Sequence, residues 1–410
     1  MKLSISAPRG HQIKAAVTIT GSKSESNRLL LLQALYPGIT IENLSNADDV
    51  RVMQKGLQVK QGEVDIHHAG TAMRFLTAYF ATLEGADIVL TGSSRMKERP
   101  IAILVDALRR LGADIDYLGN EGYPPLGLRG RALELNQISL PANVSSQYIS
   151  ALLLVAPSLK EGLILDLEGQ ITSVPYIRMT LQLLEELGIR NEFTGQRIRV
   201  YPKAKVDPKL VVVESDWSSA SYFYSILALS EEGSELLLSS YKANSLQGDS
   251  VLQNIYADFG VETSFEGHSI RLTKVGKAQI NHLDCDLTEA PDLAQTIAVS
   301  CFGLGISCTL TGLHTLKIKE TDRLLALEKE LTKLGGKITT TNSTLQLEPS
   351  DEIVSGVAID TYNDHRMAMA FAPLGLHTPI TINDAGVVSK SYPYFWKDLK
   401  TISFDIREVS

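Results

Sequence analysis

Apolar residues recur at helical spacing in several segments of the chain, and most of these segments end at a glycine that a strand-like run follows. The succession occupies residues 106–115, 183–189, 255–263 and 328–338, with further copies at residues 50–59 and, without the glycine, 394–404. Glycine suits this place because it adopts the left-handed conformation that ends a helix at no steric cost. The pattern therefore predicts about six similar α/β motifs, grouped as two domains of three.

The spacing of these glycines indicates that one motif is shorter than the rest. They stand at positions 56, 112, 188, 260 and 335, at intervals of 56, 76, 72 and 75 residues. Near-equal intervals favour a repeated motif over a coincidence of helix ends. The first interval is about twenty residues short of the others, so we expect the first motif to lack an outer element.

Unusual polar clusters stand just before, or at the start of, the apolar helical runs. They occupy residues 21–24, 69–71, 97–99, 144–147, 215–221, 289–292, 319–321 and 363–366. The cluster at 97–99 is followed by Pro100, which suits a first helical turn. Such residues are often ordinary helix caps. However, Lys and Arg recur from cluster to cluster, and helix starts with several cations favour a substrate that carries several anionic groups.

Composition and charge limit the class of protein. The 410-residue chain has 44% hydrophobic and 21% charged residues and a net charge of −8, which is ordinary for a globular protein of two domains. A nucleic-acid binder usually has a basic excess, so we expect no nucleic-acid partner. No apolar run approaches the ~18 residues of a membrane span, and no signal peptide is evident. We therefore expect a cytoplasmic monomer without a membrane partner.

Several common sites are disfavoured by spacing. The three cysteines, Cys285, Cys301 and Cys308, fit no metal motif and no disulfide framework, and we interpret them as reduced thiols. The adjacent His67 and His68 would not share a face, which disfavours a metal site there. The segment G-S-K-S at 21–24 lacks the pattern of a P-loop, and no G-x-G-x-x-G follows a strand. We expect neither a metal nor a cofactor.

Six blocks of sequence, taken together and in this order, resemble the EPSP synthase (enolpyruvyl transferase) family from about residue 21 to about residue 393. The blocks are G-S-K-S-E-S-N-R at 21–28, A-G-T-A-M-R at 69–74, R-M-K-E-R-P at 95–100, S-S-Q at 145–147, K-E-T-D-R-L at 319–324 and Y-N-D-H-R-M-A-M at 362–369. The resemblance implies a two-domain inside-out α/β barrel of six repeated motifs, with the active site in the interdomain cleft. It implies one enolpyruvyl-transferase domain at residues 21–213 and a second at residues 1–20 plus 214–410.

The reaction that the resemblance implies belongs to the shikimate pathway of aromatic amino-acid biosynthesis. The 5-hydroxyl of shikimate 3-phosphate adds to the enol carbon of phosphoenolpyruvate while the methylene carbon is protonated. The tetrahedral intermediate then loses phosphate and leaves an enolpyruvyl ether. Both substrates are polyanions, so the site must gather cations and N–H donors.

The resemblance also assigns residues to each substrate. It implies that shikimate 3-phosphate is bound by Lys23, Ser24, Arg28, Ser145, Ser146, Gln147, Ser173, Tyr176, Asp292 and Lys319. It implies that phosphoenolpyruvate is bound by Lys23, Gly70, Arg99, Gln147, Arg323, Arg366 and Lys390.

The proton transfers are implied to involve Asp292, Glu320 and Lys23. By the resemblance, Asp292 is the base for the 5-hydroxyl and Glu320 is the acid for the methylene carbon, since one group must accept a proton and another must donate one. The spacing of Lys319 and Arg323 is i,i+4, so we also expect both on one helix turn with Glu320 beside them.

Three positions depart from the pattern common in the family. His68 stands where many members have Asn, Phe75 where many have Pro, and Thr315 where some have a substrate-binding Asn. His68 and Phe75 lie beside Gly70 in sequence, so the response to glyphosate, which competes for the phosphoenolpyruvate pocket in this family, stays open.

Two alternative interpretations remain beside this one. The related transferase that acts on UDP-N-acetylglucosamine places a reactive Cys on a mobile loop, but residues 94–99 here contain none. A non-catalytic anion-binding protein on the same scaffold is the other alternative. It is disfavoured because Lys23, Asp292, Glu320 and the arginines are all present.

Overall fold

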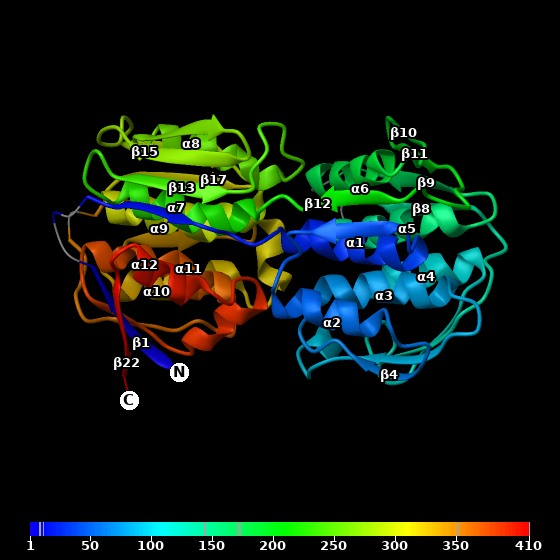
Figure 1. Cartoon of the computed structure of the whole chain (residues 1–410). Coiled ribbons are helices and arrows are strands. Elements are labelled where there is room, and N and C mark those ends of the chain that lie inside the picture. The colour runs from blue at the N-terminus through cyan, green and yellow to red at the C-terminus, as the bar shows by residue number, and fades with distance from the viewer. Residues whose placement is uncertain are drawn as a thin grey trace. The chain divides into compact units, whose positions relative to one another are not determined.

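The structure is a computed structural model that describes residues 1–7, 10, 12–142, 145–169, 171, 174–350 and 352–409. The chain divides into two compact parts (Figure 1). We call Gly21–Val213 the inserted unit, and Met1–Thr20 with Glu214–Ser410 the terminal unit. The sequence analysis divides the chain at the same residues. That the two units are enolpyruvyl-transferase domains stays a prediction at this point.

A β-α-β-α-β-β motif recurs in the inserted unit. Its first copy contains β4 (Gln61–Asp65), α3 (Gly70–Thr82), β5 (Asp87–Thr91), α4 (Ala102–Leu111), β6 (Asp114–Tyr117) and β7 (Leu126–Arg129). Strands β4 and β5 are parallel, whereas β7 pairs antiparallel with both β5 and β6. Helix α3 makes the crossover that two parallel strands require.

The second copy repeats this order, and the third is shortened. The second contains β8 (Gln137–Pro141), α5 (Ser146–Val155), β9 (Leu163–Glu168), α6 (Val174–Glu186), β10 (Asn191–Thr194) and β11 (Arg197–Val200). The third contains α1 (Lys23–Leu35), β3 (Ile39–Glu42), α2 (Asp48–Gly56) and β12 (Lys209–Val212). Its sheet has only β12 and β3, because α2 leads directly to β4 without a hairpin. The shortening expected from the first glycine interval is this missing hairpin.

Three four-stranded sheets form the terminal unit. One motif contains β2 (Lys14–Val17), α7 (Trp217–Ala228), β13 (Glu235–Ser239), α8 (Leu252–Ala257), β14 (Val261–Glu266) and β15 (Ser269–Lys274). The next contains β16 (His282–Asp286), α9 (Ala294–Leu304), β17 (Ser307–Thr311), α10 (Arg323–Lys333), β18 (Ile338–Thr340) and β19 (Leu345–Leu347). The last contains β20 (Ala358–Ile359), α11 (His365–Phe371), β21 (Ile380–Ile382), α12 (Phe395–Thr401), β22 (Asp405–Val409) and β1 (Lys2–Ser6).

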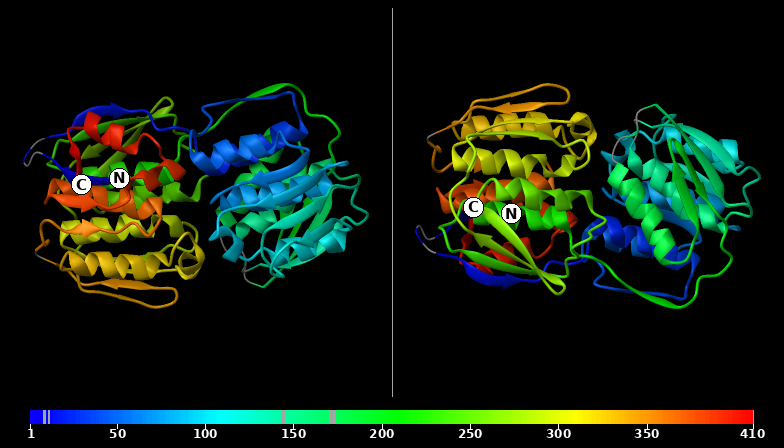
Figure 2. Two further views of the ribbon diagram at one scale, coloured as in Figure 1. Left: turned by 90° about the horizontal axis from the view of Figure 1, so that it is seen from below. Right: turned by 90° about the horizontal axis from the view of Figure 1, so that it is seen from above.

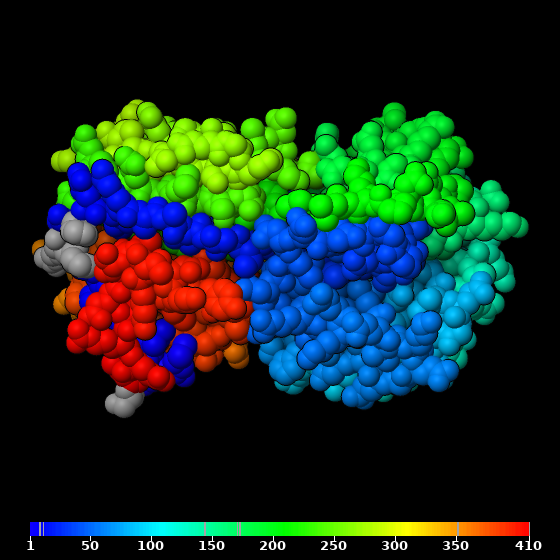
Figure 3. Space-filling model, in the orientation of Figure 1, coloured from blue at the N-terminus to red at the C-terminus, as the bar shows by residue number. Residues whose placement is uncertain are grey.

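The N-terminal strand β1 completes the last sheet of the terminal unit. It lies between β21 and β22 and pairs antiparallel with both, with Leu3 opposite Ile382 on one side and Glu408 on the other. In Figure 3 the N-terminal residues, in blue, therefore lie beside the C-terminal residues, in red, within this unit.

Helices occupy the interior of each unit, and the sheets cover them (Figure 2). The first helix of a motif is buried on all sides, as in α3, α5, α7, α9 and α11. The second helix buries one face, as in α4 and α10. A helix that is apolar all round belongs in a core, and an amphipathic one belongs at its edge. The prediction of an inside-out α/β fold with six motifs, three in each unit, is confirmed.

Glycines end most of the second helices as predicted. Gly112 follows α4 with a φ of +110°, and Gly188 follows α6 with a φ of +70°, a region that side chains disfavour. One local expectation was wrong. Helix α4 begins at Ala102, after a 3₁₀ turn at Met96–Glu98, so Pro100 precedes the first helical turn instead of occupying it.

Candidate active site

The predicted polar clusters stand at helix N-termini in both units. Capping side chains accept hydrogen bonds from backbone N–H groups of the first turn in α1, α5, α7, α10 and α11, through Ser22, Ser145, Asp216, Asp322 and Asp364. The ordinary interpretation as helix caps is therefore correct for these five residues. The cations beside them are not needed for capping, so their contacts indicate what else the clusters do.

Arg323 is the centre of the group in the terminal unit. Its guanidinium donates from Nε to Asp364 Oδ2 (2.7 Å), from Nη1 to Asp292 Oδ1 (2.8 Å) and from Nη2 to Glu320 Oε2 (2.8 Å). The side chain is 2% exposed. Burial lowers the pKa of Arg323, but the charges of the three carboxylates outweigh burial and raise it above its usual value. Arg323 is therefore a permanent cation that orients three acids.

Asp292 is shared among three cations. Besides Arg323, Nη2 of Arg366 lies 3.0 Å from Asp292 Oδ2, and Nζ of Lys319 lies 3.5 Å from Asp292 Oδ1. A carboxylate with three cationic neighbours is favoured in its ionised form, which is the form a general base needs.

The helical expectation for Lys319 and Arg323 was wrong, although the two side chains do meet at Asp292. Lys319 and Glu320 follow a 3₁₀ helix at His314–Ile318, and α10 begins only at Arg323. Asp322 caps α10 by accepting from the N–H of Leu325 (3.1 Å), which places the residues before it outside the helix.

The turn before α11 positions the remaining predicted cations of this unit. Tyr362 and Asn363 have φ values of +53° and +59°, an uncommon conformation for residues with a side chain. Glu330, on α10 and fully buried, accepts hydrogen bonds from the Tyr362 hydroxyl and from the N–H of Asp360. Nζ of Lys390 donates to the carbonyl oxygen of Asn363. The turn is thus fixed from two sides, and Lys390 is brought next to the start of α11.

Arg28 is the centre of the group in the inserted unit. It is 2% exposed and donates to Thr180 Oγ1 (2.8 Å), Ser150 Oγ (3.0 Å) and the backbone oxygens of Ser24 (2.8 Å) and Tyr176 (3.3 Å). Burial lowers its pKa to about 10, against the opposing effects of Tyr176 and Glu25. The predicted residues Ser24, Arg28 and Tyr176 are therefore neighbours.

Gly70 allows Arg99 to lie directly over the start of α3. A Cβ atom on Gly70 would come 2.7 Å from Nη1 and 2.9 Å from Nη2 of Arg99. Gln147, in the first turn of α5 with Ser146, donates to Thr71 Oγ1 (3.1 Å). Lys23 forms an ion pair with Asp49 (3.0 Å) at the start of α1. Ser173 lies outside the described residues.

The positions that depart from the family pattern have specific contacts. The ring of Phe75 is fully buried, and the Arg28 guanidinium lies 5.4 Å from its centroid. Nδ1 of His68 lies 3.0 Å from Ser93 Oγ. Phe75 therefore packs against Arg28, one of the residues predicted to bind shikimate 3-phosphate.

Sequence reasoning missed several partners of these residues. Asp364 and Ser218 belong to the clusters at 363–366 and 215–221, so motif position could have identified them. Thr180, Ser150 and Asp249 carry no such signal, because their neighbours lie 30 to 152 positions away in the chain.

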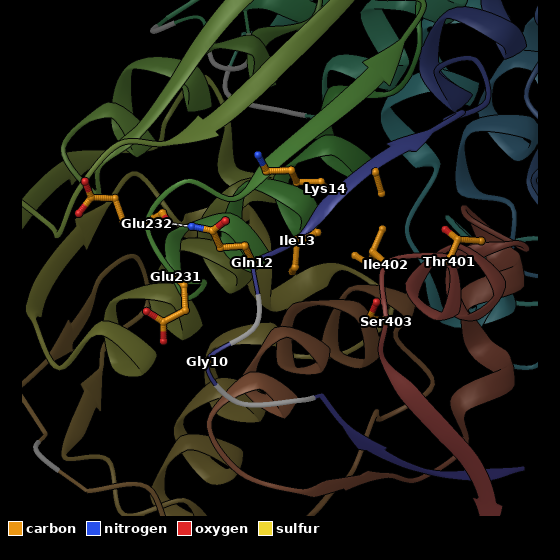
Figure 4. Close-up of a pocket in the computed structure, with 10 residues that line it drawn as sticks. Gly10, Gln12, Ile13, Lys14, Glu231, Glu232, Thr401, Ile402 and Ser403 are labelled. Carbon is orange, nitrogen blue, oxygen red and sulfur yellow. Dashed lines mark hydrogen bonds between the residues drawn. The ribbon is translucent and has the colours of Figure 1, made fainter.

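The predicted residues thus form two groups, one in each unit. That the groups meet in an interdomain cleft stays a prediction. A separate pocket of about 720 Å³ lies within the terminal unit (Figure 4), lined by residues that include Gln12, Lys14, Glu231, Glu232 and Ser403. The side-chain amide of Gln12, in this pocket, donates to the backbone oxygen of Glu232 (2.8 Å). None of the predicted site residues lines it.

The described residues also bear on the cysteines, on membrane-spanning helices and on metal clusters. The three cysteines are unpaired thiols, as predicted. Within the described ranges, no helix has the length and apolar character to cross a membrane, and no cluster of three His, Cys, Asp or Glu side chains has the geometry of a metal site.

Comparison with known proteins identifies the family of the chain. Residues 54–399 match the family profile of EPSP synthase (3-phosphoshikimate 1-carboxyvinyltransferase). The chain is 46% identical to a 3-phosphoshikimate 1-carboxyvinyltransferase of Bacteroides fragilis, with 99% of each chain covered, and 36% identical to one of Vibrio atlanticus, with 96% of this chain and 97% of the relative covered.

Solved structures show the same fold. An EPSP synthase from Acinetobacter baumannii superposes with a TM-score of 0.80 over 99% of this chain and 100% of the other, at 22% identity. A second structure of EPSP synthase from that organism gives a TM-score of 0.81 at 21% identity. With the profile match, the full-length relatives and the shared fold, the chain belongs to the EPSP synthase (3-phosphoshikimate 1-carboxyvinyltransferase) family.

Proposed function

We propose that this protein transfers the enolpyruvyl group of phosphoenolpyruvate to the 5-hydroxyl of shikimate 3-phosphate and releases phosphate, a step in aromatic amino-acid biosynthesis. The observation that carries the proposal is the arrangement around Asp292. Its carboxyl group contacts Arg323, Arg366 and Lys319, and Arg323 also contacts Glu320. An oriented acid and base among several cations suits a reaction between two polyanions that needs a proton moved in each direction.

Residues of both groups contribute to each substrate: Asp292 and Lys319 of the terminal unit join those that bind shikimate 3-phosphate, and Lys23, Gly70, Arg99 and Gln147 of the inserted unit join those that bind phosphoenolpyruvate. Lys23, Ser24 and Arg28, with Ser145, Ser146, Gln147, Ser173 and Tyr176, bind shikimate 3-phosphate in this proposal. Arg99, Arg323, Arg366 and Lys390 bind phosphoenolpyruvate, with Gly70 giving the close approach to a helix N-terminus. Arginine suits these anions because its planar N–H groups match two oxygens of a carboxylate or phosphate.

The first half-reaction forms a C–O bond and moves two protons. Asp292 removes the proton of the 5-hydroxyl as its oxygen attacks C2 of phosphoenolpyruvate. Glu320 in its protonated form gives a proton to C3, which becomes a methyl group. Because Asp292 and Glu320 accept hydrogen bonds from the same guanidinium at 2.8 Å, their relative placement is set before the substrates arrive.

The second half-reaction reverses the carbon protonation. The Glu320 carboxylate left by the first half-reaction takes a proton from the methyl group, the C2–C3 double bond re-forms and the C2–O bond to phosphate breaks. Lys23 and the arginines stabilise the charge that develops on the departing phosphate. Lys23 is paired with Asp49 in this structure, and its ammonium group has three N–H donors in all. We also propose that the protein is a cytoplasmic monomer.

The direct test is phosphate release from purified protein given both substrates with a chelator present. We expect release only when shikimate 3-phosphate and phosphoenolpyruvate are both supplied, and a new enolpyruvyl ether in equal amount by NMR. Release with UDP-N-acetylglucosamine instead would assign the related transferase activity. Tight binding of shikimate 3-phosphate without any turnover would assign a non-catalytic binding protein.

A further inference from the structure

Asp249 is an acid of the terminal unit that has no part in the proposed chemistry. The hydroxyl group of Ser218 nevertheless connects it to Arg366. It stands in a short 3₁₀ helix, Gly248–Val251, is 5% exposed and accepts a hydrogen bond from the hydroxyl of Ser218. Ser218 stands in the first turn of α7, and its Oγ lies 3.3 Å from Nη2 of Arg366. Burying a carboxyl group costs free energy unless it is paired, so the buried position of Asp249 needs an explanation.

The hydrogen bonds between these three residues run in one direction. An ionised carboxylate can only accept, so the single hydroxyl hydrogen of Ser218 points to Asp249. The oxygen of Ser218 is then an acceptor for Nη2 of Arg366. That nitrogen also donates to Asp292 Oδ2 (3.0 Å), so it is fixed between a serine that Asp249 orients and the proposed base.

Charged groups surround Asp249 from each neighbouring element. Asp292 precedes α9, Arg366 belongs to α11, and Asp216 caps α7. Burial raises the pKa of Asp249 to about 6, and the charge of Asp292 adds to the rise while Arg366 opposes it. Asp249 is therefore mostly ionised at neutral pH and becomes protonated just below it.

We propose that Asp249 is a positioning residue that acts through Ser218 to fix the orientation of the Arg366 guanidinium toward an anionic substrate group. The proposal rests on the proposed function, in which Arg366 binds phosphoenolpyruvate. Among the described residues, no hydrogen bond uses Nε of Arg366, and Nη1 makes only one, of 3.4 Å, to the carbonyl oxygen of Asp292. Both paired edges of the guanidinium include Nη2, so Nε and Nη1 are left to donate single hydrogen bonds to a carboxylate or phosphate, and the directions of these bonds depend on the plane in which Nη2 is held.

The first experiment separates KM from kcat in two variants. Asp249→Asn keeps the shape of the side chain but removes its charge and its obligatory role as an acceptor. Ser218→Ala removes the link itself. For both we expect KM for phosphoenolpyruvate to rise about tenfold, while KM for shikimate 3-phosphate and kcat change by less than about threefold. Ser218→Thr, which keeps the hydroxyl group, should restore a KM close to that of the wild type.

A matched control and a pH profile exclude a merely structural effect. Asp398→Asn removes a half-buried acid of this unit, one that accepts from the Tyr392 hydroxyl (2.8 Å), and should leave both KM values unchanged. The ratio of KM for phosphoenolpyruvate between Asp249→Asn and wild type should fall toward one as the pH falls through about 6, because the wild-type carboxyl group then also loses its charge. Titration of the substrate cancels in this ratio.

The outcomes distinguish the two proposals. Wild-type protein that releases no phosphate overturns the proposed function, and the positioning role with it. Active wild-type protein with an unchanged KM for phosphoenolpyruvate in a folded Ser218→Ala variant overturns the positioning role alone. So does a raised KM ratio that stays constant from pH 7.5 to pH 5.

Discussion

Asp292 and Arg323 are joined by a hydrogen bond of 2.8 Å that connects the proposed base to a buried cation. The carboxyl group of Asp292 stands before α9, whereas the guanidinium belongs to the first residue of α10. The segments at the starts of two successive α-helices of one motif thus contribute one side chain each. The contact fixes the carboxyl group in place and favours its ionised form.

Replacing Asp292 by Asn should abolish turnover while leaving substrate binding largely intact. The amide has the shape of the carboxyl group but cannot take the proton of the 5-hydroxyl. We expect kcat to fall by a factor of about 100 or more, and KM for either substrate to change much less. Asp286→Asn, an exposed acid that accepts from Thr288 in its own turn, is the control and should keep full activity. A kcat of Asp292→Asn within about threefold of wild type would remove Asp292 from the chemistry.

Local signals predicted the fold well, since each depends on residues close in sequence. Gly112 and Gly188 marked helix ends because a left-handed residue is needed there. The boundary before α10 was misplaced because an i,i+4 spacing does not reveal whether a helix has already begun. Asp322 sets the start of α10 because its side chain caps the helix. In the sequence alone, a capping aspartate cannot be told from any other acid.

The site could be predicted only as far as the resemblance to the family extends. Arg28 and Arg323 were identified through their blocks, but the residues that orient them were not. Thr180 contacts Arg28 across 152 positions, and Asp364 contacts Arg323 across 41. Such pairs arise from the stacking of separate motifs, which periodicity along one helix does not report.

Arg28→Lys should weaken the inserted unit and its affinity for shikimate 3-phosphate. An ammonium group cannot reproduce the four hydrogen bonds of the buried guanidinium, so polar groups of Thr180 and Ser150 lose a donor. We expect the free energy of unfolding to fall by about 2 kcal/mol and KM for shikimate 3-phosphate to rise at least about tenfold. Chemical denaturation and steady-state kinetics measure the two effects. Arg178→Lys, at an exposed position of α6, the helix that contains Thr180, should alter neither, and an unchanged KM in Arg28→Lys would exclude the predicted binding role.

Gly70→Ala should alter the phosphoenolpyruvate site without unfolding the protein. The new methyl group would lie 2.7 to 3.0 Å from the guanidinium of Arg99, which is the flexible end of a side chain and can move away. We expect KM for phosphoenolpyruvate to rise about tenfold, with a melting temperature within a few degrees of wild type. Gly38→Ala, where the nearest atom would lie 3.6 Å away, is the control. If KM for phosphoenolpyruvate stayed at its wild-type value, the displacement of Arg99 would have no bearing on binding.

Lys274 provides a pH-dependent contribution to stability that is separate from the site. Its Nζ donates to the backbone oxygens of Ala228 (2.8 Å) and Phe259 (2.7 Å), and the residue is 5% exposed. Burial lowers its pKa from 10.5 to about 8, against the opposing charge of Glu232. Between these two pH values the folded state has released the proton and the unfolded state retains it. Stability from this residue therefore rises with pH across that window, and a neutral amine still donates both hydrogen bonds.

Comparison of wild type with Lys274→Met isolates this contribution, because all other titrating groups cancel in the difference. We expect the free energy of unfolding of wild type, relative to Lys274→Met, to increase by about 2 kcal/mol between pH 8 and pH 10. Urea denaturation at intervals of half a pH unit gives the curve. Lys277→Met, which removes an exposed lysine close to Lys274 in sequence, is the control. A difference for Lys274→Met that is flat, or that decreases over this range, would show that the buried ammonium group keeps its proton in the folded protein.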